Sequence, residues 1–169
     1  MNIKIIKDFH HLILAPNNIE IAGIFKKTPN FIGGSETKTV SPFEVENELN
    51  KLIKKYKESD EDIISKVSKF HADFEKIHPF VDGNGRTGRL LMNMELMKNG
   101  YPICIIENKD RLEYYNSLEL AQTKNDYSKI ISFIEKNLEN TFEMYFNHIS
   151  NDWKKEFKEW ENLNEKKLI

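Results

Sequence analysis

The chain is poor in cysteine. Cysteine occurs once, as Cys104, so no disulfide can form within the chain. Cys104 lies in a short apolar run, residues 103–106, which predicts a packed core residue. This cysteine usage is typical of a reducing compartment. We therefore expect a cytoplasmic location, with export as an effector left open.

The chain also lacks long apolar runs and an excess of positive charge. No run approaches the length that crosses a membrane, and no signal-peptide pattern opens the sequence. Its 25 Lys and Arg residues face 27 Asp and Glu residues, which gives a formal net charge of −2. Charges of both signs are interspersed, and no basic face stands out. We therefore expect neither a membrane nor a nucleic acid as partner.

With 169 residues the chain is long enough to bury a core, and we expect one domain over residues 1–169. Helical periodicity dominates the sequence and predicts an all-α fold. Helices are expected over residues 3–14, 42–56, 60–78, 86–98, 110–124 and 127–149. A final amphipathic stretch is marked by Trp153, Phe157 and Trp160, and we expect these aromatics to dock the terminal helix onto the rest of the domain.

Two helix starts carry recognisable signals. Ser41, Pro42 and Glu44 form a capping-box signature, in which the serine and glutamate side chains bond to backbone N–H groups at the helix start. Ser59 or Asp60 is expected to cap the next helix.

The densest set of chemical groups lies in residues 78–89, which read His-Pro-Phe-Val-Asp-Gly-Asn-Gly-Arg-Thr-Gly-Arg. Pro79 pushes the residue before it out of the helical conformation, so the preceding helix should end at His78. The next helix should begin near Arg86, and Arg86 and Arg89 then share one of its faces. Unpaired backbone N–H groups at that helix start, together with two planar guanidinium groups, favour binding of a polyphosphate.

Two further side chains complete a candidate site for nucleotide-dependent group transfer. Asp82 precedes the glycine loop and could hold Mg²⁺, which prefers one or two carboxylates together with phosphate oxygens. His78 has a side chain suited to proton abstraction near neutral pH. The alternative is a glycine-rich turn between two helices with solvated arginines. The other histidines in the first half, His10, His11 and His71, are expected to serve packing or surface roles.

The same stretch resembles the Fic family motif His-x-Phe-x-Asp/Glu-Gly-Asn-Gly-Arg-x-x-Arg, and it meets every fixed position. The resemblance extends over about residues 9–145 and implies a Fic-fold helical bundle with a small β-hairpin flap over the active site. Residues 146–169 would then form a C-terminal helical extension. Most proteins with this motif transfer AMP from ATP to a target hydroxyl. The resemblance therefore implies ATP as co-substrate, Mg²⁺ as cofactor and a target protein with a Ser, Thr or Tyr hydroxyl as partner.

The resemblance also implies a role for each loop residue. His78 would take the proton of the target hydroxyl, and Phe80 would anchor the loop in the core. The nucleotide-binding roles fall on Gly83, Asn84, Gly85, Arg86 and Arg89. The first three would hold the α- and β-phosphates through backbone and amide donors. The two arginines would bind the outer phosphates and steady the leaving pyrophosphate.

Outside the motif the resemblance is carried by shorter pieces. The segment 23–40 carries glycines and a proline between short apolar pieces, which predicts a hairpin or flap, and Ile32 takes the place of an apolar clamp residue. Tyr114, Tyr115 and Gln122 fall where the family forms its adenosine pocket, although the tyrosines also fit a plain helix face. Lys26 stands where the family usually has an arginine, and no role is assigned to it, since lysine cannot replace a bidentate guanidinium.

The regulation and the transferred group stay open. Many Fic proteins carry an inhibitory helix with the signature Ser/Thr-x-x-x-Glu-Gly/Asn, whose glutamate pairs with the second motif arginine, here Arg89. The sequence has no such signature, so inhibition is either lacking or supplied by a separate antitoxin-like chain. Family relatives remove AMP or transfer UMP, phosphate or phosphocholine. A nucleotide-sensing, partner-binding module without turnover is the alternative outside the enzyme class, and a homo-oligomer or self-modification is compatible with the sequence.

Overall fold

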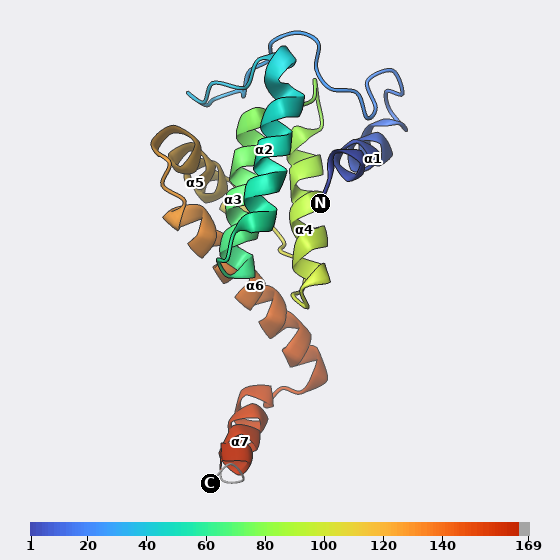
Figure 1. The fold of residues 1–169 in the computed structure, drawn as a ribbon. Helices are drawn as coiled ribbons and strands as arrows, with labels where there is room; N and C mark the ends of the chain where they lie inside the picture. The colour runs from blue at the N-terminus through green and yellow to red at the C-terminus, as the bar shows by residue number, and fades with distance from the viewer. Residues whose placement is uncertain (166–169) are drawn as a thin grey trace.

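The computed structural model describes residues 1–165, which form seven α-helices and two short 3-10 turns (Figure 1). The helices are α1 (Ile3–Leu14), α2 (Val45–Glu58), α3 (Ile63–Ile77), α4 (Asn84–Lys98), α5 (Arg111–Lys124), α6 (Ser128–Ile149) and α7 (Trp153–Glu165). The 3-10 turns are Pro42–Glu44 and Asn108–Asp110. The prediction of an all-α fold is confirmed, because the described residues contain no strand. No helix in the described range is both long and apolar enough to cross a membrane.

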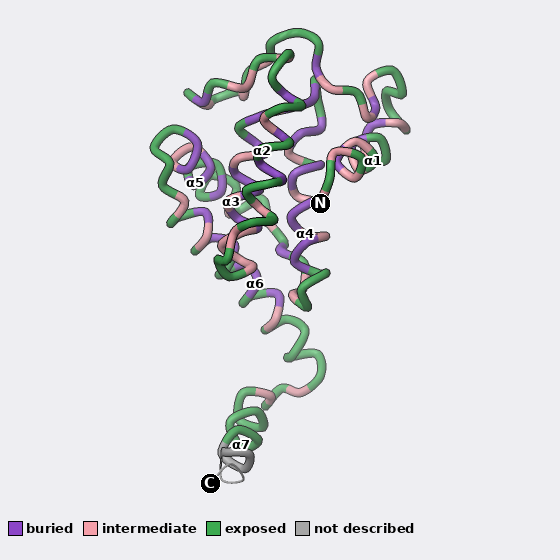
Figure 2. Tube along the Cα trace, viewed as in Figure 1, coloured by how far each residue is buried: buried purple, intermediate pink, exposed green. Residues whose placement is uncertain are grey.

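Helix α3 is the centre of the bundle, since it packs against α2, α4, α5 and α6. Two clusters of buried side chains form the core. One cluster joins α3, α4, α5 and α6 through residues such as Val67, Leu96 and Phe133. The other joins α1, α2, α3 and α4 through residues such as Leu49 and Phe74. Figure 2 shows this burial as purple segments gathered in the bundle. The loop that follows α3 leads directly into α4, so both of its ends are attached to helices of the core.

The ends of α3 place the functional loop. Its N-cap is Asp62, whose carboxylate accepts the backbone N–H of Ser65 at 2.9 Å, so the cap lies two or three residues beyond the predicted Ser59 or Asp60. The helix stops at Ile77, and His78 takes a left-handed conformation before the proline. The predicted end of this helix is therefore confirmed, and the proline explains it.

The predicted capping box at Ser41 is wrong. Ser41 makes no side-chain capping bond, because residues 42–44 form a 3-10 turn ahead of α2. In this turn the carbonyl of Ser41 accepts the N–H of Glu44 at 2.9 Å, so the donor that a capping box would satisfy is already bonded. Helix α2 then begins at Val45.

The predicted β-hairpin over residues 23–40 is not formed. The backbone of this segment is irregular, and its polar groups bond to side chains elsewhere instead of to a facing strand. Glu119 on α5 accepts hydrogen bonds from the hydroxyl of Ser35 and from the backbone N–H of Glu36. Thr37 is held by its hydroxyl, which donates to Gln122 at 2.9 Å. Side-chain bonds to α5 therefore replace the ladder that a hairpin requires.

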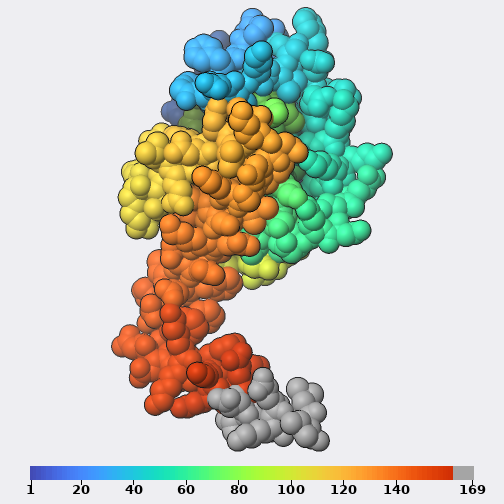
Figure 3. All heavy atoms as spheres, turned by 90° about the vertical axis from the view of Figure 1, so that its left-hand side faces the viewer, coloured from blue at the N-terminus to red at the C-terminus, as the bar shows by residue number. Residues whose placement is uncertain are grey.

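The end of α6 and helix α7 leave the bundle as an arm (Figures 1 and 3). Within the described residues, α7 contacts α6 and no other helix. Trp153 stacks on Phe146 of α6 with ring centroids 4.7 Å apart, as expected for a docked helix. Phe157 and Trp160 stack on one another with ring centroids 5.8 Å apart and are 51% and 59% exposed. The predicted docking is thus confirmed for Trp153 and stays a prediction for the other two aromatics. Residues 166–169 lie outside the described part, and the expected 1–169 domain stays a prediction there.

Candidate active site

His78 is the C-cap of α3 and the first residue of the loop, and its backbone is in a strained left-handed conformation with φ 50° and ψ 59°. Non-glycine residues adopt this region rarely, and such strain is concentrated at functional sites. The Nδ1 atom lies 3.1 Å from the carbonyl oxygen of Glu75. A carbonyl only accepts, so Nδ1 carries the hydrogen and Nε2 keeps its lone pair. Burial lowers the pKa of His78, and nearby Lys26 lowers it further against the opposing carbonyl bond, so the imidazole is neutral at pH 7.

Asn84 closes the loop onto itself. Its amide oxygen accepts the N–H of Phe80 and its amide nitrogen donates to the carbonyl of Phe80, both at 2.8 Å. The side chain is buried and both ends of its amide are engaged. The predicted contact of this amide with phosphate stays a prediction. Asn84 also carries a backbone N–H at the first position of α4, where no intrahelical acceptor is present.

Phe80 is the loop's anchor, as predicted. Its side chain is fully buried in the cluster that joins α1 to α4. The ring stacks on His10 of α1, with centroids 3.6 Å apart and planes 2° from parallel, and lies against Phe25. A fixed ring in the middle of the loop limits how far the neighbouring His78 and Asp82 can move.

Gly83 is required by both backbone and space. Its φ of +77° lies in the left-handed region, and a Cβ at this position would lie 2.4 Å from the Leu14 side chain of α1. Gly85 is less crowded, since a Cβ there would meet the guanidinium of Arg89 at 3.3 Å. Gly83 therefore lets the start of α4 pack closely against α1. Gly85 leaves space beside Arg89 for a ligand.

Asp82 and Arg86 pair with one another across the mouth of the site. One carboxylate oxygen of Asp82 lies 3.1 Å from Arg86, and the other accepts the N–H of Gly83 at 2.6 Å. Both side chains are exposed, so the pair contributes little to stability and can be exchanged for other partners. One solvent-facing carboxylate beside two arginines suits Mg²⁺ bound together with phosphate oxygens. No group of three or more His, Cys, Asp or Glu side chains is assembled for a metal elsewhere in the described chain.

The motif residues line one cavity of about 280 Å³. Its walls are His78, Val81, Asp82, Gly83, Asn84, Gly85, Arg86, Arg89 and Tyr115. Every motif side chain predicted to act on substrate, nucleotide or metal is in this set, and Phe80 lies beneath it as the anchor. The loop turns a linear motif into a concave surface with a neutral base, one carboxylate and two guanidinium groups.

A second cavity, of about 570 Å³, adjoins the first and shares His78, Gly85, Arg89 and Tyr115 with it. Its remaining walls come from the flap segment, α5 and Glu75 of α3, and they include Ile32, Tyr114 and Gln122. The structure thus brings the flap and adenosine-pocket candidates to the motif. Tyr115 is half exposed there, whereas Tyr114 is almost wholly buried and its hydroxyl bonds to Nε2 of His71 at 2.6 Å.

Gln122 is held from two sides. Its amide oxygen accepts the hydroxyl of Thr37, and its amide nitrogen donates to the carbonyl of Ala72 at 3.1 Å. The side chain is buried, and in this arrangement it ties the flap segment to α3 and α5. The amide keeps a second N–H and a second oxygen lone pair, and its contact with an adenine stays a prediction.

Sequence reasoning missed the clamp on the loop backbone. The buried amine of Lys26 donates to the Asn30 side chain at 2.7 Å and to the carbonyl of Ile77 at 3.3 Å. Asn30 in turn donates to the carbonyls of His78 at 3.2 Å and Phe80 at 2.8 Å. Burial lowers the pKa of Lys26 to about 8. The signal in the sequence was Lys26 itself, which stands among apolar residues in place of the arginine that is usual in the family. A buried lysine needs several hydrogen-bond acceptors.

Two buried titratable groups on α3 were also missed. His71 and Glu75 face the first turn of α4, where a Cβ on Gly88 would lie 3.1 Å from the imidazole and 2.2 Å from the carboxylate. Burial lowers the pKa of His71 to about 4 and raises that of Glu75 to about 7. The positive charge of Arg89 lowers the pKa of both side chains, so it opposes the effect of burial at Glu75 and adds to it at His71. Both groups therefore respond to a residue of the candidate site.

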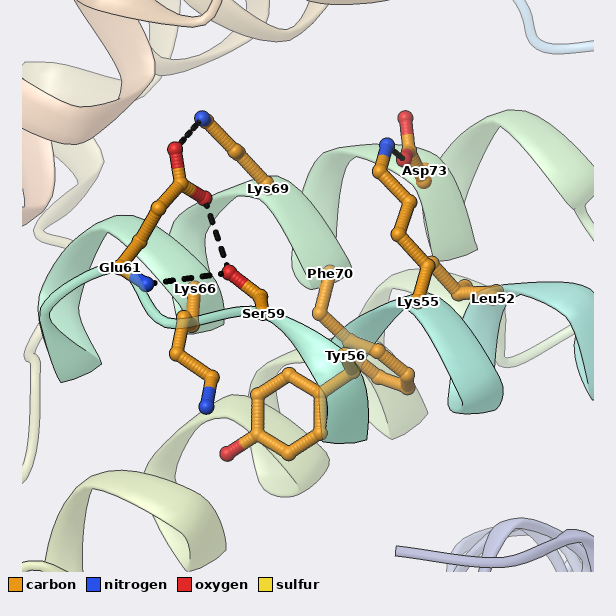
Figure 4. A pocket seen from close by; sticks show the side chains of 9 residues that line it. All are labelled: Leu52, Lys55, Tyr56, Ser59, Glu61, Lys66, Lys69, Phe70 and Asp73. Carbon is orange, nitrogen blue, oxygen red and sulfur yellow. Dashed lines mark hydrogen bonds and ion pairs between the residues drawn. The ribbon is translucent and has the colours of Figure 1, made fainter.

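A crevice between α2 and α3 lies away from the motif (Figure 4). It is small, about 70 Å³, and its lysines are already partnered. Lys55 pairs with Asp73 at 3.0 Å, Lys69 pairs with Glu61, and the amine of Lys66 lies over the ring of Tyr56. No residue of the 78–89 loop lines it, so the candidate active site is the pair of cavities above.

Comparison with solved structures defines the class of fold. The chain superposes on Fic-1 from C. elegans with a TM-score of 0.80 and 26% identity, covering 90% of this chain and 45% of that one. A Fic domain containing signaling protein from Bacteroides thetaiotaomicron gives a TM-score of 0.77 at 24% identity, covering 87% of this chain and 62% of the other, a likeness of fold.

Sequence comparison then gives the family. The Fic/DOC family profile matches residues 1–96, which is more than half of the chain, and the chain therefore belongs to the Fic/DOC family. It is 48% identical over 75 residues to the protein adenylyltransferase Fic of Drosophila mojavensis and of Drosophila melanogaster. That match covers 44% of this chain and only 15% of each fly protein, so the chain spans a small part of these relatives.

Proposed function

We propose that this protein is an adenylyltransferase that transfers AMP from ATP to a Ser, Thr or Tyr hydroxyl of a target protein. The observation that carries the proposal is that His78, whose Nδ1 is bonded to the carbonyl of Glu75, lines the same cavity as Arg86 and Arg89. A base without charge beside two phosphate-binding cations is suited to activating a hydroxyl next to a nucleotide. The similarity to protein adenylyltransferases supports the same reading.

The reaction is a substitution at the α-phosphorus. The target hydroxyl oxygen forms a bond to that phosphorus, the bond to the bridging oxygen of pyrophosphate breaks, and Nε2 of His78 accepts the hydroxyl proton. Arg86 and Arg89 hold the outer phosphates, where negative charge grows on the leaving group. The backbone N–H groups of Asn84 and Gly85, at the start of α4, would hold the α- and β-phosphates. Catalysis rests on positioning and charge stabilisation.

Asp82 would hold Mg²⁺. The metal would supply neutralisation of the phosphate charge. To hold it, Asp82 would give up its contact with Arg86, and this pair is exposed and weakly held. Arg86 would then be free to bind the phosphates. Pairing in the free protein thus keeps both side chains at the mouth of the cavity without fixing them there.

The nucleotide and the chemistry have alternatives within the family. Removal of AMP, or transfer of UMP, phosphate or phosphocholine, would use the same loop. The adenosine side of the site is the weaker part of the proposal, because Gln122 is already bonded to Thr37 and Ala72. A nucleotide-sensing module without turnover is the other alternative, and the neutral, poised His78 favours an enzyme over it.

The test is incubation of the purified chain, Mg²⁺ and a cell lysate with ATP labelled in its α-phosphate, followed by mass spectrometry of labelled proteins. Parallel reactions use UTP. We expect AMP on protein hydroxyls, including those of the chain itself, without any activating substitution. His78→Ala should reduce labelling roughly 10²- to 10⁴-fold, the contribution of a positioned base. His11→Ala, which removes an exposed histidine from α1, is the matched control and should label normally.

Three outcomes would contradict the proposal. Transfer of UMP in place of AMP would show that ATP is not the co-substrate. Full labelling by His78→Ala would show that His78 is not the base. An inactive wild type that binds Mg²⁺-ATP would favour the sensing module or an inhibitor. Activation by replacing Glu156 or Glu159 would place that inhibitor in α7, and activity on separation from a co-purifying chain would favour an antitoxin-like partner.

A further inference from the structure

His10 is a buried histidine of α1 that touches the active-site loop through two contacts and the flap segment through one. It is fully buried and lies far from the loop in sequence. The backbone N–H of Gly23 donates to its Nδ1 atom at 2.8 Å. Since Nδ1 accepts, Nε2 must carry the hydrogen, and it donates to the backbone carbonyl of Asp82 at 2.9 Å. One neutral tautomer therefore satisfies both partners.

The third contact is the parallel stack of the His10 ring on Phe80, with centroids 3.6 Å apart. The same face of α1 also limits the next residue of the loop. A Cβ on Gly83 would lie 2.4 Å from Leu14 and 3.3 Å from Nε2 of His10. Helix α1 thus contacts the loop from Phe80 to Gly83 at three places. His10 stacks on the ring of Phe80 and bonds to the carbonyl of Asp82, and Leu14 leaves room for no side chain at Gly83.

The carbonyl contact bears on the metal ligand. The Asp82 carboxylate is exposed, and its partners are the adjacent N–H of Gly83 and the exposed guanidinium of Arg86. No core side chain holds the carboxylate directly. Its direction is therefore set by the Asp82 backbone, and His10 is the side chain that fixes this backbone from the core.

We infer that His10 is a positioning residue for Asp82, which it aims at the Mg²⁺ that accompanies the nucleotide. The inference rests on the proposed function. It goes beyond packing, because a packed ring alone would not fix the Asp82 peptide. If His10 only supported the fold, its replacement would weaken the binding of nucleotide equally with and without Mg²⁺. If His10 positions Asp82, its replacement weakens only the Mg²⁺-dependent binding.

The experiment measures binding of AMP-PNP by calorimetry, with Mg²⁺ and with EDTA. His10→Phe keeps an aromatic ring for the stack on Phe80 but loses both hydrogen bonds. We expect it to weaken Mg²⁺-AMP-PNP binding roughly 3- to 10-fold, the effect of losing about one neutral hydrogen bond. Binding in EDTA should change less than about 2-fold. His11→Phe is the matched control on the same helix and should match wild type in both conditions.

A double-mutant cycle separates positioning from packing. In an Asp82→Ala background, His10→Phe should have no further effect on Mg²⁺-AMP-PNP binding, because the side chain it positions is gone. His10→Gln, whose amide can still donate to the Asp82 carbonyl, should recover part of the metal preference. Circular dichroism and the melting temperature establish that each variant is folded.

Several results would overturn the inference. These are equal losses with Mg²⁺ and EDTA, additive effects of the two substitutions, or unfolding of both His10 variants, which would show a structural role. Failure of the proposed function looks different, because the wild type itself would then show no Mg²⁺-dependent binding of AMP-PNP.

Discussion

Glu75 gives the sharpest test of the electrostatics behind this site. The carboxyl is buried on α3, its Oε1 atom has no hydrogen-bond partner, and it faces the first turn of α4. Burial raises its pKa from 4.5 to about 7, with Arg89 opposing. One pKa unit corresponds to about 1.36 kcal/mol. The ionised carboxylate therefore destabilises the folded state by about 3 kcal/mol relative to its protonated form.

The sign follows from proton linkage. Below pH 4.5 the carboxyl is protonated in both the folded and the unfolded chain, so ionisation costs nothing. Between pH 4.5 and 7 the unfolded chain ionises first, and the free energy of unfolding falls. Above pH 7 both states are ionised and the full cost of about 3 kcal/mol is present. Glu75→Gln removes this dependence, so the variant should gain about 3 kcal/mol on wild type as the pH rises from 4.5 to 8.

The assay is urea unfolding of wild type, Glu75→Gln and Glu135→Gln at several pH values. Glu135 is an exposed glutamate of α6, and its variant should track wild type throughout. The other titratable groups around the carboxyl are His71 on α3, His78 just after the end of α3, Arg89 on α4 and Tyr114 on α5. The low pKa of His71 lowers stability as the pH falls below 6.5, in the opposite direction, and cancels in the difference between variants. A difference that does not change with pH would refute the reasoning.

Three further predictions concern the loop and its arginine. Arg89→Ala should weaken nucleotide binding roughly 10- to 150-fold by calorimetry, the range for a charge-assisted hydrogen bond, and an unchanged affinity would place the phosphates elsewhere. Asn84→Ala leaves the N–H and carbonyl of Phe80 without their partners and should lower the free energy of unfolding by about 1–3 kcal/mol in urea; an unchanged value would mean that water replaces the amide. Gly88→Ala places a Cβ 2.2 Å from Glu75 and should lower the free energy of unfolding by about 1–3 kcal/mol through overpacking. The measurement is the melting temperature, and an unchanged value would mean that the carboxylate rotates away at no cost.

The sequence was a good guide where the signal is local. Pro79 ended α3 at His78, the helical periodicity predicted the all-α class, and the motif predicted which residues share a cavity. It was a poor guide where local rules compete. The capping signature at Ser41 gave way to a 3-10 turn, and the glycines of the flap suggested a hairpin that the structure does not form.

The sequence by itself determined the chemistry of residues 78–89, because the order of base, carboxylate, glycines and arginines is a property of the chain. Only the tertiary structure decided which protons and amides are free to act. The tautomer of His78 depends on the carbonyl of Glu75, and the Gln122 amide is occupied by Thr37 and Ala72. The loop takes its shape from His10, some seventy residues away in the chain. Such contacts follow from burial and packing between distant segments, which no local pattern encodes.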